Sequence, residues 1–289
     1  MSAGPATAPA AASPSAPVRA AVRVSPRSAL VLGLASLAGL FMLCWPLLLN
    51  VPSGARVDPP FLFLGLIPVV LAVVLAELHE GGLDPRVLAI LGVLSAVNAV
   101  LRGISPGLGG VELTFFLLVL AGRAFGPGFG FVLGVTSLFA SALMTAGVGP
   151  WLPYQMLCAA WVGLGAGLLP RRLHGRVELA ALAGYAVLAS YLYGLLMNLS
   201  GWPFLTGVVV EGHAGSLSYV AGAPVLDNLH TFLVYTLLTS TGSWDTLRAI
   251  TTATAVVLLG PAILTTLRRA SRRATVVGRV SAGAAGPPR

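Results

Sequence analysis

The stretch "GVGPWLPYQMLCAAWVGLGAGLLPRR", residues 147–172, is an apolar run with aromatic and polar residues at one end and paired arginines at the other. Its central part, 151–169, carries no charged side chain and approaches the roughly 20 residues that a helix needs to cross a bilayer. Arginines are enriched on the cytoplasmic side of membrane helices. The stretch therefore predicts a membrane-spanning helix whose polar entrance lies on the outer side.

The composition of the whole chain agrees with a membrane environment. Of its 289 residues 56% are hydrophobic and only 9% are charged, whereas about 25% are charged in a typical soluble domain. The net charge of +8 comes from arginines at the ends of apolar runs, which is a signal of topology and not of nucleic-acid binding. Cys44 and Cys158 lie inside apolar runs, so we expect neither a disulfide framework nor a thiolate metal site.

Eight apolar runs follow one another along the chain, and we expect each to be a helix. They lie at about 29–49, 60–78, 86–104, 112–122, 127–147, 151–169, 177–199 and 249–267. The first 27 residues are rich in Ala, Pro and Ser, which predicts a disordered cytoplasmic tail. A cleaved signal peptide is the alternative, but the run that follows approaches a full span.

The arginines orient these helices. With a cytoplasmic N-terminus and eight alternating spans, 14 of the 17 arginines fall on the cytoplasmic side, as the positive-inside rule favours. We therefore expect a multi-pass protein of the cell membrane with both termini cytoplasmic and a basic tail at 271–289. The stretch 225–240 contains Asp227, Asn228 and His230, so we expect an outer-side or re-entrant helix within a long outer loop, 200–248.

The expected helix 86–104 carries two separate stripes when its residues are placed 100° apart. One stripe consists of small residues, which let another helix approach closely in lipid: Ala89, Gly92, Ala96 and Ala99. The other stripe is polar and should avoid lipid: Ser95, Asn98 and Arg102. Arg102 could instead extend to the interface while Asn98 bonds a neighbouring helix.

The entrance of the 151–169 run offers groups suited to a flat polar ligand. Trp151 and Tyr154 supply aromatic faces, and Gln155 supplies a donor and an acceptor. The alternative for Trp151 is an aromatic residue of the membrane interface. Glu112 and Asn198 lie at the outer ends of neighbouring runs, where Glu112 could instead complement a helix N-terminus.

Two acidic residues near the end of the chain have ordinary structural explanations. Asp245 precedes the last run, so we expect it to cap that helix. Asp227 could cap the helix expected after it, although the Asp227–His230 stretch is the second choice for a ligand site.

These features occur within longer motifs that resemble a known family. The motifs are "GVLSAVNA" at 92–99, "LAGRAFGPGFGFVLGVTSLFASALMTAGVGPWLPYQML" at 120–157, "WVGLGAGLLPRR" at 161–172, "WDTLRAI" at 244–250 and "LLGPAILTTLRR" at 258–269. They resemble the S components, the substrate-binding membrane subunits, of energy-coupling factor (ECF) vitamin transporters.

The resemblance implies an all-α polytopic membrane protein with a six-helix module at 86–270. Two extra transmembrane helices at 28–80 would precede this module, and the additional outer-side helix would lie in its last long loop. A vitamin or related micronutrient would bind at the outer side, with no cofactor. The module would dock, through its small-residue stripe, onto a T component that carries two ATPase subunits and drives uptake.

Two other classes of function stay open at this point. A secondary transporter needs coupling-ion sites at the midplane, but the acids here lie at the ends of runs or in loops. A membrane enzyme acting on lipids could use Glu77, His79, Glu80 and Asp84, but a short charged connection is more often an ordinary solvated loop, which is the favoured explanation. The chain has no Walker motif, so it should not hydrolyse ATP itself. Which vitamin binds is not identified; the long outer loop favours a large heterocycle such as cobalamin.

Overall fold

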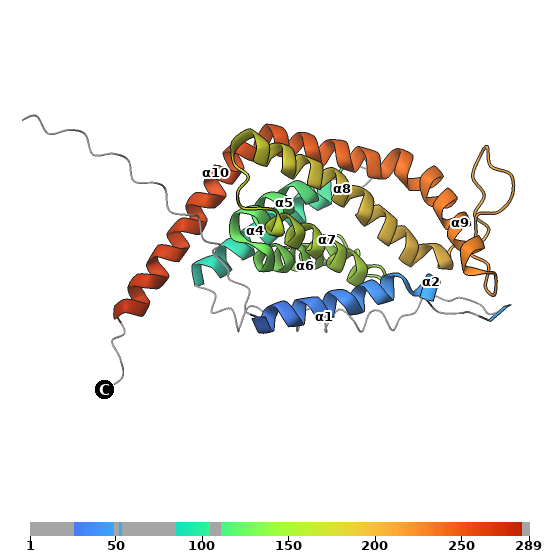
Figure 1. The fold of residues 1–289 in the computed structure, drawn as a ribbon, viewed down its shortest axis with the longest axis horizontal. Helices are drawn as coiled ribbons and strands as arrows, with labels where there is room; N and C mark the ends of the chain where they lie inside the picture. The colour runs from blue at the N-terminus through green and yellow to red at the C-terminus, as the bar shows by residue number, and fades with distance from the viewer. Residues whose placement is uncertain (1–25, 49–51, 54–84, 105–110, 285–289) are drawn as a thin grey trace, which may run out of the picture.

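The computed structural model describes residues 26–48, 52–53, 85–104 and 111–284, and every regular element in these ranges is helical (Figure 1). The elements are α1 Pro26–Leu43, α2 Trp45–Leu48, α4 Pro85–Ile104, α5 Thr114–Phe125, α6 Pro127–Met144, α7 Leu152–Leu168, α8 Gly175–Gly201, the 3₁₀-helix η2 Trp202–Phe204, α9 Val225–Thr236, the π-helix η3 Leu237–Asp245 and α10 Thr246–Ala284. The expected all-α architecture is confirmed. The tail up to residue 25 and the expected helix at 60–78 lie outside the described residues.

Four helices are long and apolar enough to cross a membrane, judged by length and composition among the described residues. They are Pro85–Ile104, Pro127–Met144, Gly175–Phe204 and the continuous helix Val225–Arg273. On α4 the side chains of Leu88, Val93 and Val97 are exposed, as suits contact with lipid.

The short helix α5 lies at the centre of the molecule. Its residues 114–122 are all buried, and it contacts α6, α7, α8 and α10. This central position explains why the apolar run expected at 112–122 is shorter than the roughly 20 residues of a lipid-facing span. A helix surrounded by other helices is apolar on every side and needs less length than one that faces lipid.

Glycines bring α5, α6 and α7 into backbone contact. A Cβ atom added at Gly163 of α7 would overlap the carbonyl oxygen of Gly130 on α6, and one added at Gly122 of α5 would overlap the carbonyl oxygen of Gly163. Between α5 and α6 the chain turns at Gly126, whose φ of 111° favours glycine. The glycines of "FGPGFG" and "GLGAG" therefore serve a tight turn and close helix packing.

The N-terminal helix α1 packs on the module and is not a separate unit. It contacts α7 and α8, and the indole Nε1 of Trp161 donates to Ser36 Oγ over 2.9 Å. Beyond it, Trp45 of α2 stacks on Phe204 with 5.7 Å between ring centroids. This N-terminal segment therefore reaches the end of the module where α8 finishes.

The end of the bundle that we expect to be cytoplasmic is held by an arginine network. Arg123 of α5 pairs with Glu178 of α8 over 2.6 Å and donates to the carbonyl oxygens of Leu169 and Leu173 over 2.8 and 3.1 Å. Arg268 of α10 pairs with the same carboxylate. These arginines thus connect α5, α8, α10 and the α7–α8 turn.

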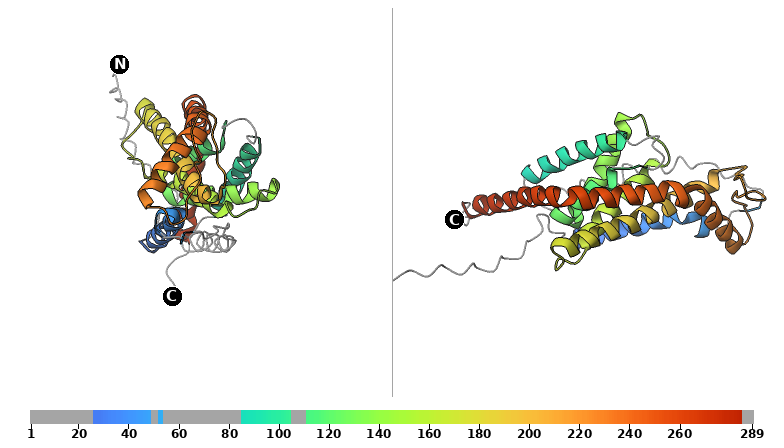
Figure 2. Two further views of the ribbon diagram at one scale, coloured as in Figure 1. Left: turned by 90° about the vertical axis from the view of Figure 1, so that its right-hand side faces the viewer. Right: turned by 90° about the horizontal axis from the view of Figure 1, so that it is seen from above.

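The last part of the chain differs from the sequence expectation in one respect. The stretch 225–240 is helical, as expected, but it continues without a break through η3 into α10, so that the loop before it spans only 205–224. Figures 1 and 2 show this bent helix running beside α8. Asn228 is compatible with a helix here because it is bonded to the backbone N–H and C=O of Val220 over 3.1 and 2.9 Å.

Candidate functional site

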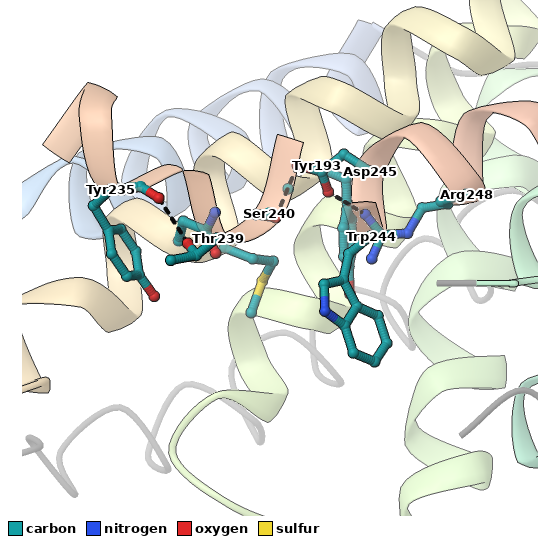
Figure 3. A pocket seen from close by; sticks show the side chains of 10 residues that line it. Tyr193, Tyr235, Thr239, Ser240, Trp244, Asp245 and Arg248 are labelled. Carbon is teal, nitrogen blue, oxygen red and sulfur yellow. Dashed lines mark hydrogen bonds and ion pairs between the residues drawn. The ribbon is translucent and has the colours of Figure 1, made fainter. Parts of the chain in front are cut away.

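A cavity of about 300 Å³ lies between α8 and the bent helix (Figure 3). It is lined by the last turns of α8, whereas the Arg123 network binds Glu178 in the first turn of that helix, at the opposite end. Helix α8 contributes Tyr193, Gly194, Met197 and Asn198, and the bent helix contributes Tyr235, Thr239, Ser240, Trp244, Asp245 and Arg248. Asp245 and Arg248 lie at one end of this group, and Tyr235 and Thr239 lie at the other. The cavity thus combines aromatic, hydroxyl, amide and charged groups.

Arg248 is the centre of the charged part of the site. Its Nε donates to Glu112 Oε2 over 2.6 Å and its Nη1 to Asp245 Oδ1 over 2.8 Å. Its guanidinium also lies over the rings of Phe115 and Tyr193, 5.7 and 5.0 Å from their centroids. The side chains of Arg248, Glu112 and Asp245 are only 11%, 18% and 1% exposed. One cation held between two carboxylates leaves a formal charge of −1.

Asp245 has a different role from the helix cap that its position in the sequence suggested. The helix runs through it from η3 into α10, so no helix starts there. Its carboxylate accepts from Ser240 Oγ over 2.9 Å, in addition to Arg248. Helix α8 can approach this carboxylate because residue 194 is glycine, where a Cβ atom would overlap it.

One polar group of the cavity lacks a partner. The Nδ2 of Asn198, near the C-terminal end of α8, is buried and has no hydrogen bond within the described part of the chain. A buried amide donor without an acceptor is unfavourable by about 1–3 kcal/mol.

The polar stripe of α4 faces the bundle interior and bonds α6 and α7. Asn98 Nδ2 donates to Ser137 Oγ over 3.0 Å. Arg102 donates to Ser141 Oγ over 3.1 Å and to Gln155 Oε1 over 2.9 Å. Asn98 and Gln155 are therefore partly used in helix–helix bonds, although Asn98 Oδ1 is buried without a partner in the described chain.

The structure thus divides the expected ligand residues into two groups. Glu112 and Asn198 belong to the cavity or to the charged group behind it, whereas Asn98, Arg102 and Gln155 form the α4–α6–α7 group. Tyr193 lies within electrostatic reach of Arg248 and Glu112 and also of Arg102.

The two aromatic residues expected in the site lie apart from the cavity lining. Tyr154 is buried and Trp151 is 52% exposed; neither lines the cavity. The indole of Trp151 lies against Gly149.

Sequence reasoning missed Arg248, Tyr193, Tyr235 and Trp244. A signal for Arg248 was present, because it is one of three arginines that the predicted topology placed outside, the others being Arg56 and Arg102. Arg56 lies outside the described residues. Arg102 and Arg248 both have their guanidinium groups bonded inside the bundle.

The small-residue stripe of α4 is only partly available to a partner. Ala89, Gly92 and Ala96 are exposed, and a Cβ atom added at Gly92 would meet nothing within 4 Å. Ala99 is 1% exposed and packs inside the molecule, since it follows the buried Asn98 as α4 turns toward α6. Ala99 therefore does not belong to an outward docking face.

Metal chemistry has no ready ligands in the part of the chain that the structure describes, where no three His, Cys, Asp or Glu residues come together. The acidic cluster on which a lipid-modifying enzyme would depend, Glu77 to Asp84, lies outside the described residues. Tyr219 and Phe232 pack on Trp202 at the loop end of the bundle, and the Nε1 of Trp202 donates to the Leu217 carbonyl oxygen over 2.7 Å.

Comparison with known families gives one match, to the family described as "ECF transporter, substrate-specific component", over residues 86–281. Comparisons with curated proteins and with solved structures give no match. The matched region runs from the start of α4 into the last turn of α10, includes the cavity and the charged group, and covers more than half of the chain. The resemblance seen in the sequence motifs is thereby confirmed, and the chain belongs to the family of substrate-specific components of ECF transporters.

Proposed function

We propose that this chain binds a vitamin or related micronutrient for ATP-driven uptake, and that the cavity between α8 and the bent helix is its binding site. The observation that carries the proposal is the buried Glu112–Arg248–Asp245 group beside an unpaired amide, Asn198 Nδ2. Buried charges are costly to hold in a membrane protein. Asp245 and Arg248 of this group line the cavity beside aromatic, hydroxyl and amide side chains, a combination that suits a polar ligand.

The orientation follows from the arginines. The Arg123 network and the basic part of α10 lie at the end of the bundle opposite the cavity. If arginine-rich ends are cytoplasmic, the cavity opens toward the outer side of the cell membrane, where an importer meets its substrate. Both termini of the six-helix module would then be cytoplasmic.

The size of the pocket is compatible with a small-molecule ligand. Ligand pockets typically have volumes of about 300–1,000 Å³, and this one, at about 300 Å³, is at the low end. Because the pocket is open on one side, a ligand can extend beyond it, and a large heterocycle such as cobalamin stays a prediction.

The partners follow from the family. A subunit of this family is part of a transporter and not an enzyme, and we propose that a T component with two ATPase subunits drives the transport. The exposed small residues Ala89, Gly92 and Ala96 on α4 would be the docking face. Small residues allow the backbone of a partner helix to approach closely. In lipid the hydrophobic effect does not drive helices together, so this close packing is what holds them.

The test of the binding function is mass spectrometry of the small molecules that stay with the protein purified in mild detergent. We expect a micronutrient in the wild-type sample and its loss from Asn198→Ala. The matched control is Gly184→Ala, at an exposed position of the same helix where a Cβ atom meets nothing within 4 Å. A folded wild-type protein that retains no micronutrient and does not co-purify with a coexpressed T component and ATPases would contradict the proposal.

A further inference from the structure

We infer that the N-terminal segment, described at residues 26–48 and 52–53, holds one wall of the cavity in place, with Trp45 as the positioning residue. This segment precedes residues 86–281, which match the family, so the inference concerns a part of the chain beyond the family's module. Trp45 does not line the cavity. Its effect on ligand affinity rests on the proposed function, whereas its effect on the position of the wall does not.

Trp45 lies between the end of α8 and the loop that precedes α9. Its ring stacks on Phe204 of η2 with an angle of 27° between the planes, and its centroid lies 6.5 Å from that of Tyr219 in the loop. The same loop meets the N-terminal segment a second time, because a Cβ atom added at Gly222 would overlap Ser53. The N-terminal segment therefore contacts the last residues before α9 at two points.

A chain of aromatic rings continues from Tyr219 to the cavity. Tyr219 lies edge-on to Trp202 with 5.4 Å between ring centroids, and Trp202 is only 1% exposed. Trp202 also stacks on Tyr235 of α9 at 6.5 Å, and Tyr235 lines the cavity (Figure 3). Ring pairs of this kind are attractive, and close-packed interiors transmit strain. A displacement of Tyr219 is therefore passed on to a ring of the cavity wall.

Helix α9, which carries this wall, depends on the same contacts. It buries three of its 12 residues, namely Asn228, Phe232 and Thr236. Two of them contact the loop or the ring chain, since Asn228 bonds the backbone of Val220 and Phe232 packs on Trp202. The position of α9, and with it that of Tyr235, is thus set by the loop and by Trp202.

The N-terminal segment can act as a support because it is itself fixed to the module. Leu43 of α1 is fully buried, and the hydroxyl of Ser36 accepts a hydrogen bond from an indole of α7 over 2.9 Å. Two residues beyond Trp45, Leu47 packs against the same buried cluster as Trp202. A segment anchored along its length holds the loop in one position, which lowers the cost of ordering the wall when a ligand binds.

The size of the effect follows from the two ring contacts of Trp45. Each aromatic pair changes an equilibrium about fivefold, so the loss of both sets an upper limit of about thirtyfold. Affinity falls in proportion to the fraction of molecules whose wall is correctly placed. Because repacking recovers part of the loss, we expect about tenfold weaker binding, and amide hydrogen exchange in the loop and α9 about tenfold faster.

The experiment compares three variants with the wild type as purified full-length protein in detergent. Trp45→Ala removes the ring, Trp45→Phe keeps a ring at the same position, and Leu48→Ala is the control, because it shortens an exposed side chain of the same short helix. Hydrogen exchange followed by mass spectrometry reports on the loop and α9 without any ligand. Equilibrium dialysis with riboflavin, thiamine, biotin, folate and cobalamin gives the affinity for whichever of these five compounds binds the wild type.

We expect faster exchange and weaker binding in Trp45→Ala, with Trp45→Phe and Leu48→Ala close to the wild type. If Trp45→Ala does not fold, Tyr219→Leu interrupts the ring chain at its second member and should have the same two effects. Exchange and affinity equal to those of Leu48→Ala in the folded variant would overturn the inference and leave the proposed function intact. Binding of none of the five compounds, together with no association with T and ATPase subunits, would overturn the proposed function, while the exchange measurement would still decide the inference.

Discussion

Replacing Gly194 by alanine should displace the carboxylate on which the cavity depends. A Cβ atom at this position of α8 would overlap the carboxylate of Asp245, whose oxygens accept from Arg248 over 2.8 Å and from Ser240 over 2.9 Å. The methyl group is fixed by the helix backbone and cannot rotate away. The side chain of Asp245 must therefore move, and both of its hydrogen bonds are lost or lengthened.

The magnitude follows from two opposing contributions. Separating a buried ion pair costs about 3–5 kcal/mol, and Arg248 keeps Glu112 as a partner, which favours the lower value. Glycine to alanine inside a helix by itself stabilises by about 1 kcal/mol. We therefore expect the free energy of unfolding to fall by about 2 kcal/mol, and ligand affinity to fall at least tenfold because Asp245 and Arg248 line the cavity.

The assay is unfolding in mixed detergent, followed by circular dichroism, together with ligand binding. Gly184→Ala is the matched control, because it makes the same chemical change on α8 where a Cβ atom has no neighbour within 4 Å; it should be neutral or slightly stabilising. If Gly194→Ala behaves like Gly184→Ala in both measurements, α8 does not approach the carboxylate of Asp245 as closely as described, and the reasoning fails.

Three further outcomes are expected. Gly163→Ala should destabilise the protein by about 1–3 kcal/mol in the same unfolding assay, because its methyl group would overlap the backbone of Gly130; a neutral effect would refute the close contact of α6 and α7. Gly92→Leu should prevent co-purification with a T component while ligand binding persists, and normal co-purification would remove α4 from the docking face. A reporter fused after Arg273 should be cytoplasmic and a cysteine at Gly215 should be labelled from outside; the opposite result would invert the topology.

The helices were largely predictable from the sequence because each is a run of apolar residues bounded by charge, proline or glycine. The runs at 86–104, 127–147, 151–169 and 177–199 correspond to α4, α6, α7 and α8 with small shifts of their ends. The polar stripe of α4 was also predictable, since polar groups spaced one turn apart avoid lipid. Its bonds to α6 and α7 agree with that reasoning.

The charged group at the cavity was not predictable in the same way. Glu112 and Arg248 are 136 positions apart, and nothing in a single sequence reports that α5 and α10 meet. Asp245 directly precedes the last apolar run, the position of a helix cap, so the sequence predicted a capping role and not a contact with Arg248. The π-helix η3 brings Ser240 and Asp245 together. Its hydrophobic pattern does not predict a helix, because most of its residues are polar or small, as in a loop.

The continuous helix from α9 to α10 connects the cavity with the opposite end of the bundle. It spans 49 residues from Val225 to Arg273, and Arg268 on this helix binds Glu178 at the far end. Each residue of an α-helix adds a rotation of about 100°, so a change from π to α winding in η3 would rotate the two parts of this helix against each other. Pro261 lies between η3 and Arg268, and because it cannot donate a backbone hydrogen bond, it is the position where such a rotation would be taken up.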